Sequence, residues 1–99
     1  MNITIRCSDK FPVDWESFRE FVQAQANRLA FGRARYGVPA SDRRYHKRGG
    51  LERSAYRRTG NREHLLNIAN YAWLESFAPE NKKFHWDNSV DSVTREELR

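Results

Sequence analysis

The sequence predicts a small, mainly α domain of about three helices, with a short N-terminal β-strand or arm and a C-terminal extension. Its 99 residues suit one domain, residues 1–99. Apolar residues recur at three- and four-residue spacing in 14–36 and 61–78, the period of an amphipathic helix. Glycine and proline interrupt the chain between these segments, where we expect the connections.

Residues 1–10 contain a stretch with a strand-like pattern. In NITIRC the side chains alternate, with Ile3 and Ile5 on one side. A lone strand is unstable, so it needs a partner from near the C-terminus or from a second copy; otherwise the stretch is an extended arm. Cys7 is the single cysteine, which excludes an intrachain disulfide and a cysteine-based zinc site, and we interpret it as a small buried side chain.

Residues 14–36 form the first predicted helix. Asp14 suits the N-cap, and Gly37 suits the C-cap after Tyr36. The apolar positions make a stripe that we interpret as core: Trp15, Phe18, Val22, Ala26 and Leu29, with Phe21 beside them.

Residues 41–59 form a basic second helix, capped by Ser41 or Asp42. Gly49 and Gly50 each cost roughly 1 kcal/mol against alanine inside a helix. The segment is therefore either one kinked helix or two short helices. The two glycines form either a hinge or simply a kink. If the helix is continuous, Tyr45, Leu51, Ala55 and Tyr56 share one side, and the cations share the other.

Residues 61–78 form the best-marked helix, which we expect to pack antiparallel on the basic one. Gly60 can end the preceding helix in the left-handed conformation, and Asn61 can cap the new one. The predicted apolar face comprises Leu65, Ile68, Ala69, Ala72 and Trp73, with Leu66 and Phe77 at its margin. The opposite side carries polar groups: His64, Asn67, Asn70, Tyr71 and Glu75. These form a polar network between neighbouring elements, a water-facing side or a ligand site.

Residues 79–99 form the C-terminal extension and lack a clear periodicity. Pro79 follows the end of the third helix. Phe84 and Trp86 flank His85, and we expect these large aromatic rings to pack on the body or on another subunit. Because the core of so short a chain is small, we expect a homo-oligomer.

Positive charge is concentrated in the middle third of the chain. Residues 33–62 hold nine Arg and one Lys against two acidic side chains, a net charge of +8, whereas the whole chain carries +5. Arginine binds phosphate through a planar fork of N–H groups, so we predict an anion-binding surface. Its candidate residues are Arg43, Arg44, Lys47, Arg48, Arg53, Arg57, Arg58 and Arg62, with Tyr45 and Tyr56 as rings that stack on bases. The alternative is a solvated face that only keeps the protein in solution.

Other kinds of site have little support in the sequence. We predict no metal site and no cofactor, because the histidines lack ligand partners at suitable spacing. Nucleophile and phosphate-loop motifs are missing, so we assign no catalytic residue. No stretch is long and apolar enough for a signal peptide or a membrane span, and we expect a cytoplasmic protein with no membrane partner.

The segments T-G-N-R-E-H-L-L-N-I-A-N-Y-A-W-L-E, P-E-N-K-K-F-H-W-D and S-V-T-R cover about the second half of the chain. They resemble small uncharacterised proteins of actinobacterial phages. The resemblance implies no activity, but it implies a setting in the host cell, where short phage proteins act on host machinery, nucleotide pools or bacterial defences. The A-N-Y-A helix is also similar to helices of the all-α nucleotide pyrophosphatases. Those enzymes hold Mg²⁺ with E-x-x-E and E-x-x-D pairs, whereas here Glu16 and Glu20 lie four apart.

The leading hypothesis is a non-enzymatic regulatory or anti-defence protein that binds nucleic acid or a nucleotide through the arginine-rich helix. The first alternative is a protein inhibitor that docks on a host protein through the aromatic C-terminal stretch. The second is a nucleotide hydrolase related to the all-α pyrophosphatases.

Overall fold

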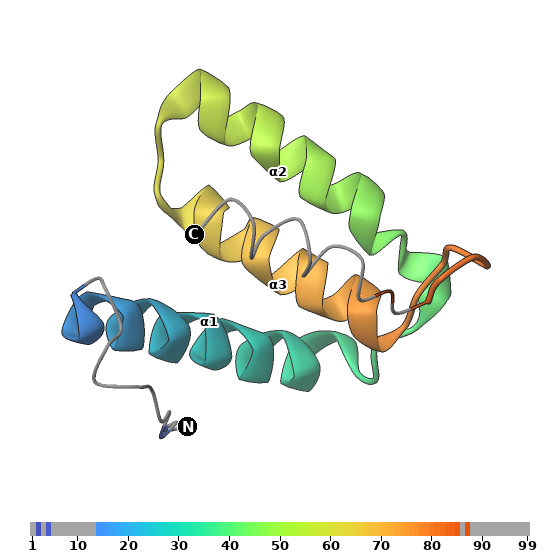
Figure 1. Ribbon diagram of the computed structural model, residues 1–99, viewed down its shortest axis with the longest axis horizontal. Coiled ribbons are helices and arrows are strands. Elements are labelled where there is room, and N and C mark those ends of the chain that lie inside the picture. Colours follow the sequence, from blue (N-terminus) through green and yellow to red (C-terminus); the bar gives the residue numbers. More distant parts are fainter. Residues whose placement is uncertain (1, 3, 5–13, 86, 88–99) are drawn as a thin grey trace.

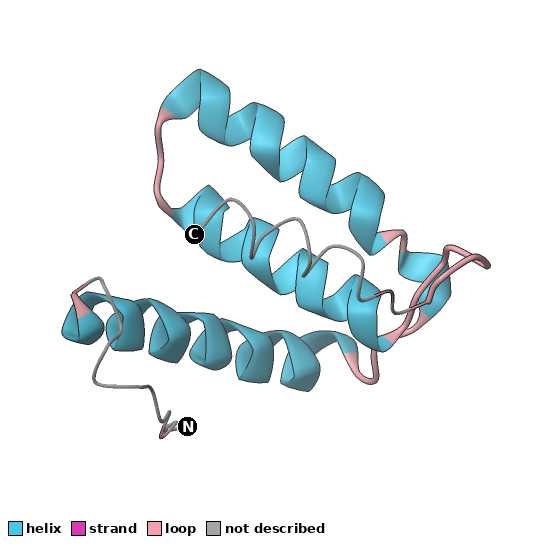
Figure 2. Cartoon of the chain, in the orientation of Figure 1, coloured by secondary structure: helices cyan, strands magenta, loops and turns pink. Residues whose placement is uncertain are grey.

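The computed structural model describes residues 2, 4, 14–85 and 87, and within them the chain forms three α-helices and one short 3-10 helix (Figure 1). These residues include no β-strand (Figure 2). The mainly α class is therefore confirmed. The predicted strand or arm at 1–10 falls almost wholly outside the described residues, as do Trp86 and residues 88–99.

Helix α1, Trp15–Tyr36, begins and ends as its sequence predicts. The side chain of Asp14 accepts hydrogen bonds from the backbone N–H groups of Glu16 and Ser17, at 3.1 and 3.3 Å. Gly37 ends the helix at φ +83°, a value that costs glycine little because it has no Cβ. Along the predicted core stripe only Ala26 is buried.

The second helical segment begins later than predicted. Ser41–Arg43 form a 3-10 turn, and α2 runs from Tyr45 to Thr59. Neither Ser41 nor Asp42 caps α2, because Arg44 separates both residues from the start of the helix. Arg44 has the left-handed conformation, at φ 55°. The Tyr45 hydroxyl accepts a hydrogen bond from the N–H of Ala40 at 3.2 Å, which fixes the connection against the start of α2.

Helix α2 runs without interruption through Gly49 and Gly50, so the alternative of two short helices is wrong. Gly49 is buried, and a Cβ placed there would lie 3.5 Å from the Cβ of Tyr71 on α3. A methyl group would therefore make an ordinary contact with Tyr71, whereas a larger side chain would push against α3. A Cβ at Gly50 would meet nothing within 4 Å, so the packing of the described residues does not require glycine there.

The turn between α2 and α3 follows its predicted chemistry. Gly60 ends α2 in the left-handed region at φ 69°. The side chain of Asn61 accepts the N–H of Glu63 at 3.0 Å, as a capping residue does. Thr59 links both sides, since its hydroxyl donates to the carbonyl of Ala55 and accepts the N–H of Asn61. Helix α3, Glu63–Phe77, starts two residues after the predicted position.

Helix α3 lies between α1 and α2, and runs antiparallel to α2 (Figure 1). Its half-buried positions run continuously from 64 to 69 because it has a neighbour on two sides. The predicted apolar face is thus partly wrong: Ala72 is exposed, and Trp73 is 47% exposed and stacks on Phe77 with ring centroids 5.3 Å apart. Asn70, placed on the polar side, is buried instead.

Past Phe77 the described chain forms turns. The carboxylate of Glu75 accepts the N–H of Glu80 at 3.0 Å and ties this segment to the end of α3. Phe84 is 54% exposed, so this ring is not packed into the described body, and the alternative that it packs on another subunit stays a prediction.

Candidate anion-binding surface

One row of α2, spaced as successive turns on one side of a helix, faces α3. Tyr45 is 4% exposed, and its ring stacks on that of Tyr71 at 6.3 Å. Gly49 lies one turn further along, against Tyr71. Glu52 follows, with its Oε2 2.5 Å from Nδ1 of His64 on α3. We call Tyr45, Gly49, Glu52 and Tyr56 the inward row.

This inward row differs from the apolar side that the sequence pattern predicted. Leu51 was expected beside Tyr45, but it is 63% exposed. The reason is that glycine and a hydrogen-bonded carboxylate can fill a helix interface when the opposite helix provides a close backbone and a histidine. The position of the inward row determines which charged side chains of α2 point away from α3.

Five cationic side chains of α2 lie outside the inward row, and all five residues are exposed. We call them the outer basic surface: Lys47, Arg48, Arg53, Arg57 and Arg58. Among the residues that the structure describes, no carboxylate forms an ion pair with any of them. Their charges are therefore available to an external anion.

The single carboxylate of α2 is turned away from these cations. Glu52 belongs to the inward row, and its side chain and that of His64 are each only 23% exposed. The ring N–H of His64 donates to the carboxylate, because an ionised carboxylate can only accept. The acidic group that could neutralise the outer basic surface from within its own helix is thus engaged elsewhere.

The other three predicted anion-binding residues flank α2. Arg43 donates to the backbone carbonyl of Tyr36 at 2.7 Å, so part of its guanidinium is already engaged. Arg44 is exposed at the start of α2, and Arg62 is exposed in the turn before α3. The structure therefore brings five of the eight predicted cations together on one helix and leaves three at its two ends.

The two predicted stacking residues do not serve that purpose equally. Tyr45 is buried between α2 and α3, so the proposal that its ring stacks on a base is wrong. Tyr56 belongs to the inward row, but its side chain is partly accessible, with 36% of the residue exposed. The surface offers a base at most one partly accessible tyrosine.

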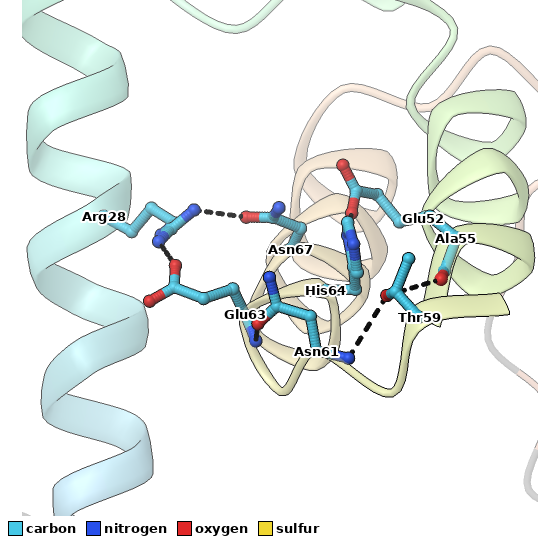
Figure 3. A network of polar contacts seen from close by, with 8 residues as sticks. All are labelled: Arg28, Glu52, Ala55, Thr59, Asn61, Glu63, His64 and Asn67. Atoms are coloured by element: carbon cyan, nitrogen blue, oxygen red, sulfur yellow. Dashed lines mark hydrogen bonds and ion pairs between the residues drawn. The ribbon is translucent and has the colours of Figure 1, made fainter. Parts of the chain in front are cut away.

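The polar side of α3 joins it to both neighbours (Figure 3). His64 contacts Glu52 on α2, whereas the side-chain oxygen of Asn67 accepts from Arg28 on α1 at 3.0 Å. Asn70 is 6% exposed, and its amide donates to the carbonyl of Gln25 on α1 at 3.3 Å. With Tyr71 stacked on Tyr45, these contacts are those of a network that holds three helices together.

Sequence reasoning missed the partners of this network. Arg28 pairs with Glu63 as well as with Asn67, and both partners lie more than thirty residues along the chain (Figure 3). No local pattern marks such a pair. The only available signal is the pair of asparagines inside α3, which indicates that tertiary contacts compensate for their poor helix propensity.

The described residues contain no group of three or more His, Cys, Asp or Glu placed to hold a metal ion. None of the described helices is both long enough and apolar enough to cross a bilayer.

Comparison with known proteins yields no relative. No family model, no curated protein and no solved structure matches this chain.

Proposed function

We propose that this chain binds a phosphate-bearing polyanion through the outer basic surface of α2, as a binding protein and not as an enzyme. The observation that carries the proposal is the arrangement of charge on one helix. Five exposed cations have no ion-pair partner among the described residues, and the only carboxylate of α2 faces inward to His64. Arginine predominates over lysine among them, which suits phosphate oxygens.

The physical consequence of this arrangement is a binding energy dominated by counterion release. A cation that neutralises a phosphate displaces a condensed counterion, so affinity falls as salt rises, by about 0.9 logarithmic units per contact on B-form DNA. If four of the five cations contact phosphates, the expected slope of log K against log salt is about −3.6.

The test measures binding of a labelled oligonucleotide at several salt concentrations. Changing Arg57 and Arg58 together to alanine should weaken binding and reduce the steepness of the salt dependence by about two contacts. The matched control changes Arg19 and Arg33 of α1 to alanine, which removes the same net charge from another helix. If both pairs have the same effect, net charge alone drives binding and the surface proposal fails.

A parallel thermal-shift screen separates a nucleic acid from a free nucleotide. A nucleotide ligand would raise the melting temperature with particular nucleotides at constant salt, because a ligand that binds only the native state stabilises it. The regulatory or anti-defence role that the phage resemblance implies stays a prediction, as does a homo-oligomeric state.

A second function, docking on a host protein, is favoured by the exposed aromatic rings around the end of α3. Trp73 and Phe77 form a stacked pair, and both are exposed, as is Phe84 beyond them. An inhibitor of this kind should capture one partner equally well when Arg57 and Arg58 are changed to alanine. It should also show no steep salt dependence with oligonucleotides.

A further inference from the structure

The distribution of side chains around α2 narrows the class of polyanion, an inference that rests on the function proposed above. Helical periodicity places two further rows on α2, one on the flank of the inward row and one opposite it. One row contains His46, Gly50, Arg53 and Arg57, and the other contains Lys47, Leu51, Ser54 and Arg58. Arg48 lies outside both rows.

The line between these rows is formed by small residues. Gly50 and Ser54 are one turn apart and lie where the two rows meet, with Ser54 opposite the inward row and Gly50 nearer its flank. Arg53 and Arg57 lie on one side of this line, and Lys47 and Arg58 lie on the other. The helix thus presents a low central ridge, with cationic side chains on both flanks.

No contact within the described part of the chain explains the glycine at position 50. A Cβ at this position would meet no atom within 4 Å, and glycine inside a helix costs roughly 1 kcal/mol relative to alanine. Its neighbour Gly49, by contrast, is packed against Tyr71. A partner that closely approaches the outer face of α2 would account for a small residue at this point.

We infer that α2 seats its outer face in the major groove of a B-form DNA duplex, with Gly50 and Ser54 toward the floor and the flanking cations on the phosphates of the two strands. A helix with its side chains is about 10–12 Å across, and the major groove is about 12 Å wide. Fifteen residues of helix extend about 22 Å, enough to follow the groove past several phosphates on each side.

The same geometry argues against the other nucleic acids. Single strands are held by aromatic rings on which bases stack, and the structure buries Tyr45 and leaves Tyr56 only at the edge of the surface. The major groove of an RNA duplex is deep and too narrow for side chains to read. The outer face of a helix is convex, which suits an extended groove better than a single nucleotide.

The experiment uses the full chain and fluorescence anisotropy with a labelled DNA duplex of mixed sequence, the matching single strand and an RNA duplex. The variants are Gly50→Gln and Ser54→Gln, which add an uncharged, helix-compatible side chain to the ridge and leave every cation in place. The control is Ala34→Gln, at an exposed position of α1. Far-UV circular dichroism checks that each variant is folded.

Each ridge variant should lower affinity for the DNA duplex about tenfold and leave affinity for the single strand unchanged, whereas the control should change neither. Methyl green, which occupies the major groove, should displace the protein, and the minor-groove ligand netropsin should not. Two variants are used so that a folding defect in one leaves the test intact.

The failures are distinguishable. If both ridge variants bind the duplex as the unmodified chain does, or if single strands or RNA duplexes bind more tightly, groove seating is wrong while polyanion binding stands. If the unmodified chain binds none of the three nucleic acids in a salt-dependent way, the proposed function fails, and this inference fails with it.

Discussion

Asn70 and Asn67 provide a sharp test of the fold, because the same isosteric change should have unequal effects at two positions on one helix. Asn70 uses its amide nitrogen as a donor to the carbonyl of Gln25, in a buried site. Asn67 uses its oxygen as an acceptor from Arg28, in a half-buried site. Replacing each by aspartate removes the donor and keeps the acceptor.

Asn70→Asp should lower the free energy of unfolding by about 3 kcal/mol at neutral pH. Loss of one hydrogen bond contributes about 1 kcal/mol, and burial of a carboxylate against a carbonyl contributes about 2 kcal/mol more. Asn67→Asp should change stability by less than about 0.5 kcal/mol, because the new charge meets the guanidinium of Arg28, which Glu63 already shares.

The assay is equilibrium unfolding in urea, followed by circular dichroism at pH 7 and at pH 4.5. The protonated form of the new carboxyl group can donate to the carbonyl of Gln25, so its pKa in the folded state lies above that in the unfolded chain. The loss of stability from Asn70→Asp should therefore shrink as pH falls, by at most about 1.4 kcal/mol per pH unit. Equal losses for the two variants at neutral pH would refute the assigned roles of the two amides.

Three further predictions concern the helices and their junctions. Gly50→Leu should raise the free energy of unfolding by up to about 1 kcal/mol, because leucine has the better helix propensity and a Cβ there meets no atom within 4 Å. Gly49→Leu should lower it by about 1–3 kcal/mol, because the larger side chain would press against Tyr71. Equal stabilities of the two variants in urea unfolding would contradict the packing of α2 on α3. Asn61→Ala should lower the free energy of unfolding by about 1 kcal/mol, because the N–H of Glu63 loses its cap, and Asn61→Asp should restore most of it. The ion pair of Arg28 with Glu63 is largely exposed, so a double-mutant cycle with Arg28→Ala and Glu63→Gln should give a coupling energy of about 0.5 kcal/mol. A coupling energy above about 2 kcal/mol would show that solvent does not screen this ion pair.

The sequence predicted those parts of the fold that depend on local chemistry. The cap at Asp14, the end of α1 at Gly37 and the turn at Gly60 and Asn61 each follow from the conformational preferences of one or two residues. Arg44 shows the limit of this reasoning, since a left-handed arginine has no sequence signal and its position shifts the start of α2 past the expected caps.

The packed faces were harder to predict because the inward row of α2 is not apolar. Periodicity gives weight to Leu51, whereas the structure places Gly49 against Tyr71 and pairs Glu52 with His64. For the candidate site, the sequence identified the cations and their helix. It did not show that the carboxylate of that helix turns inward, or that the ring of Tyr45 is unavailable, because both depend on α3.

The position of α3 between α1 and α2 also affects the order in which the helices unfold. Helices α2 and α3 are joined by a turn of three residues and pack through the buried Tyr45 and Gly49 of α2. Helix α1 contacts α3 from far along the chain, with hydrogen bonds at Arg28 and the carbonyl of Gln25. The α2–α3 hairpin is consequently the part that can assemble from local contacts and persist when α1 detaches. Backbone amides of α1 should accordingly exchange with deuterium before those of the hairpin, and the cation-bearing helix should keep its shape throughout the partial opening.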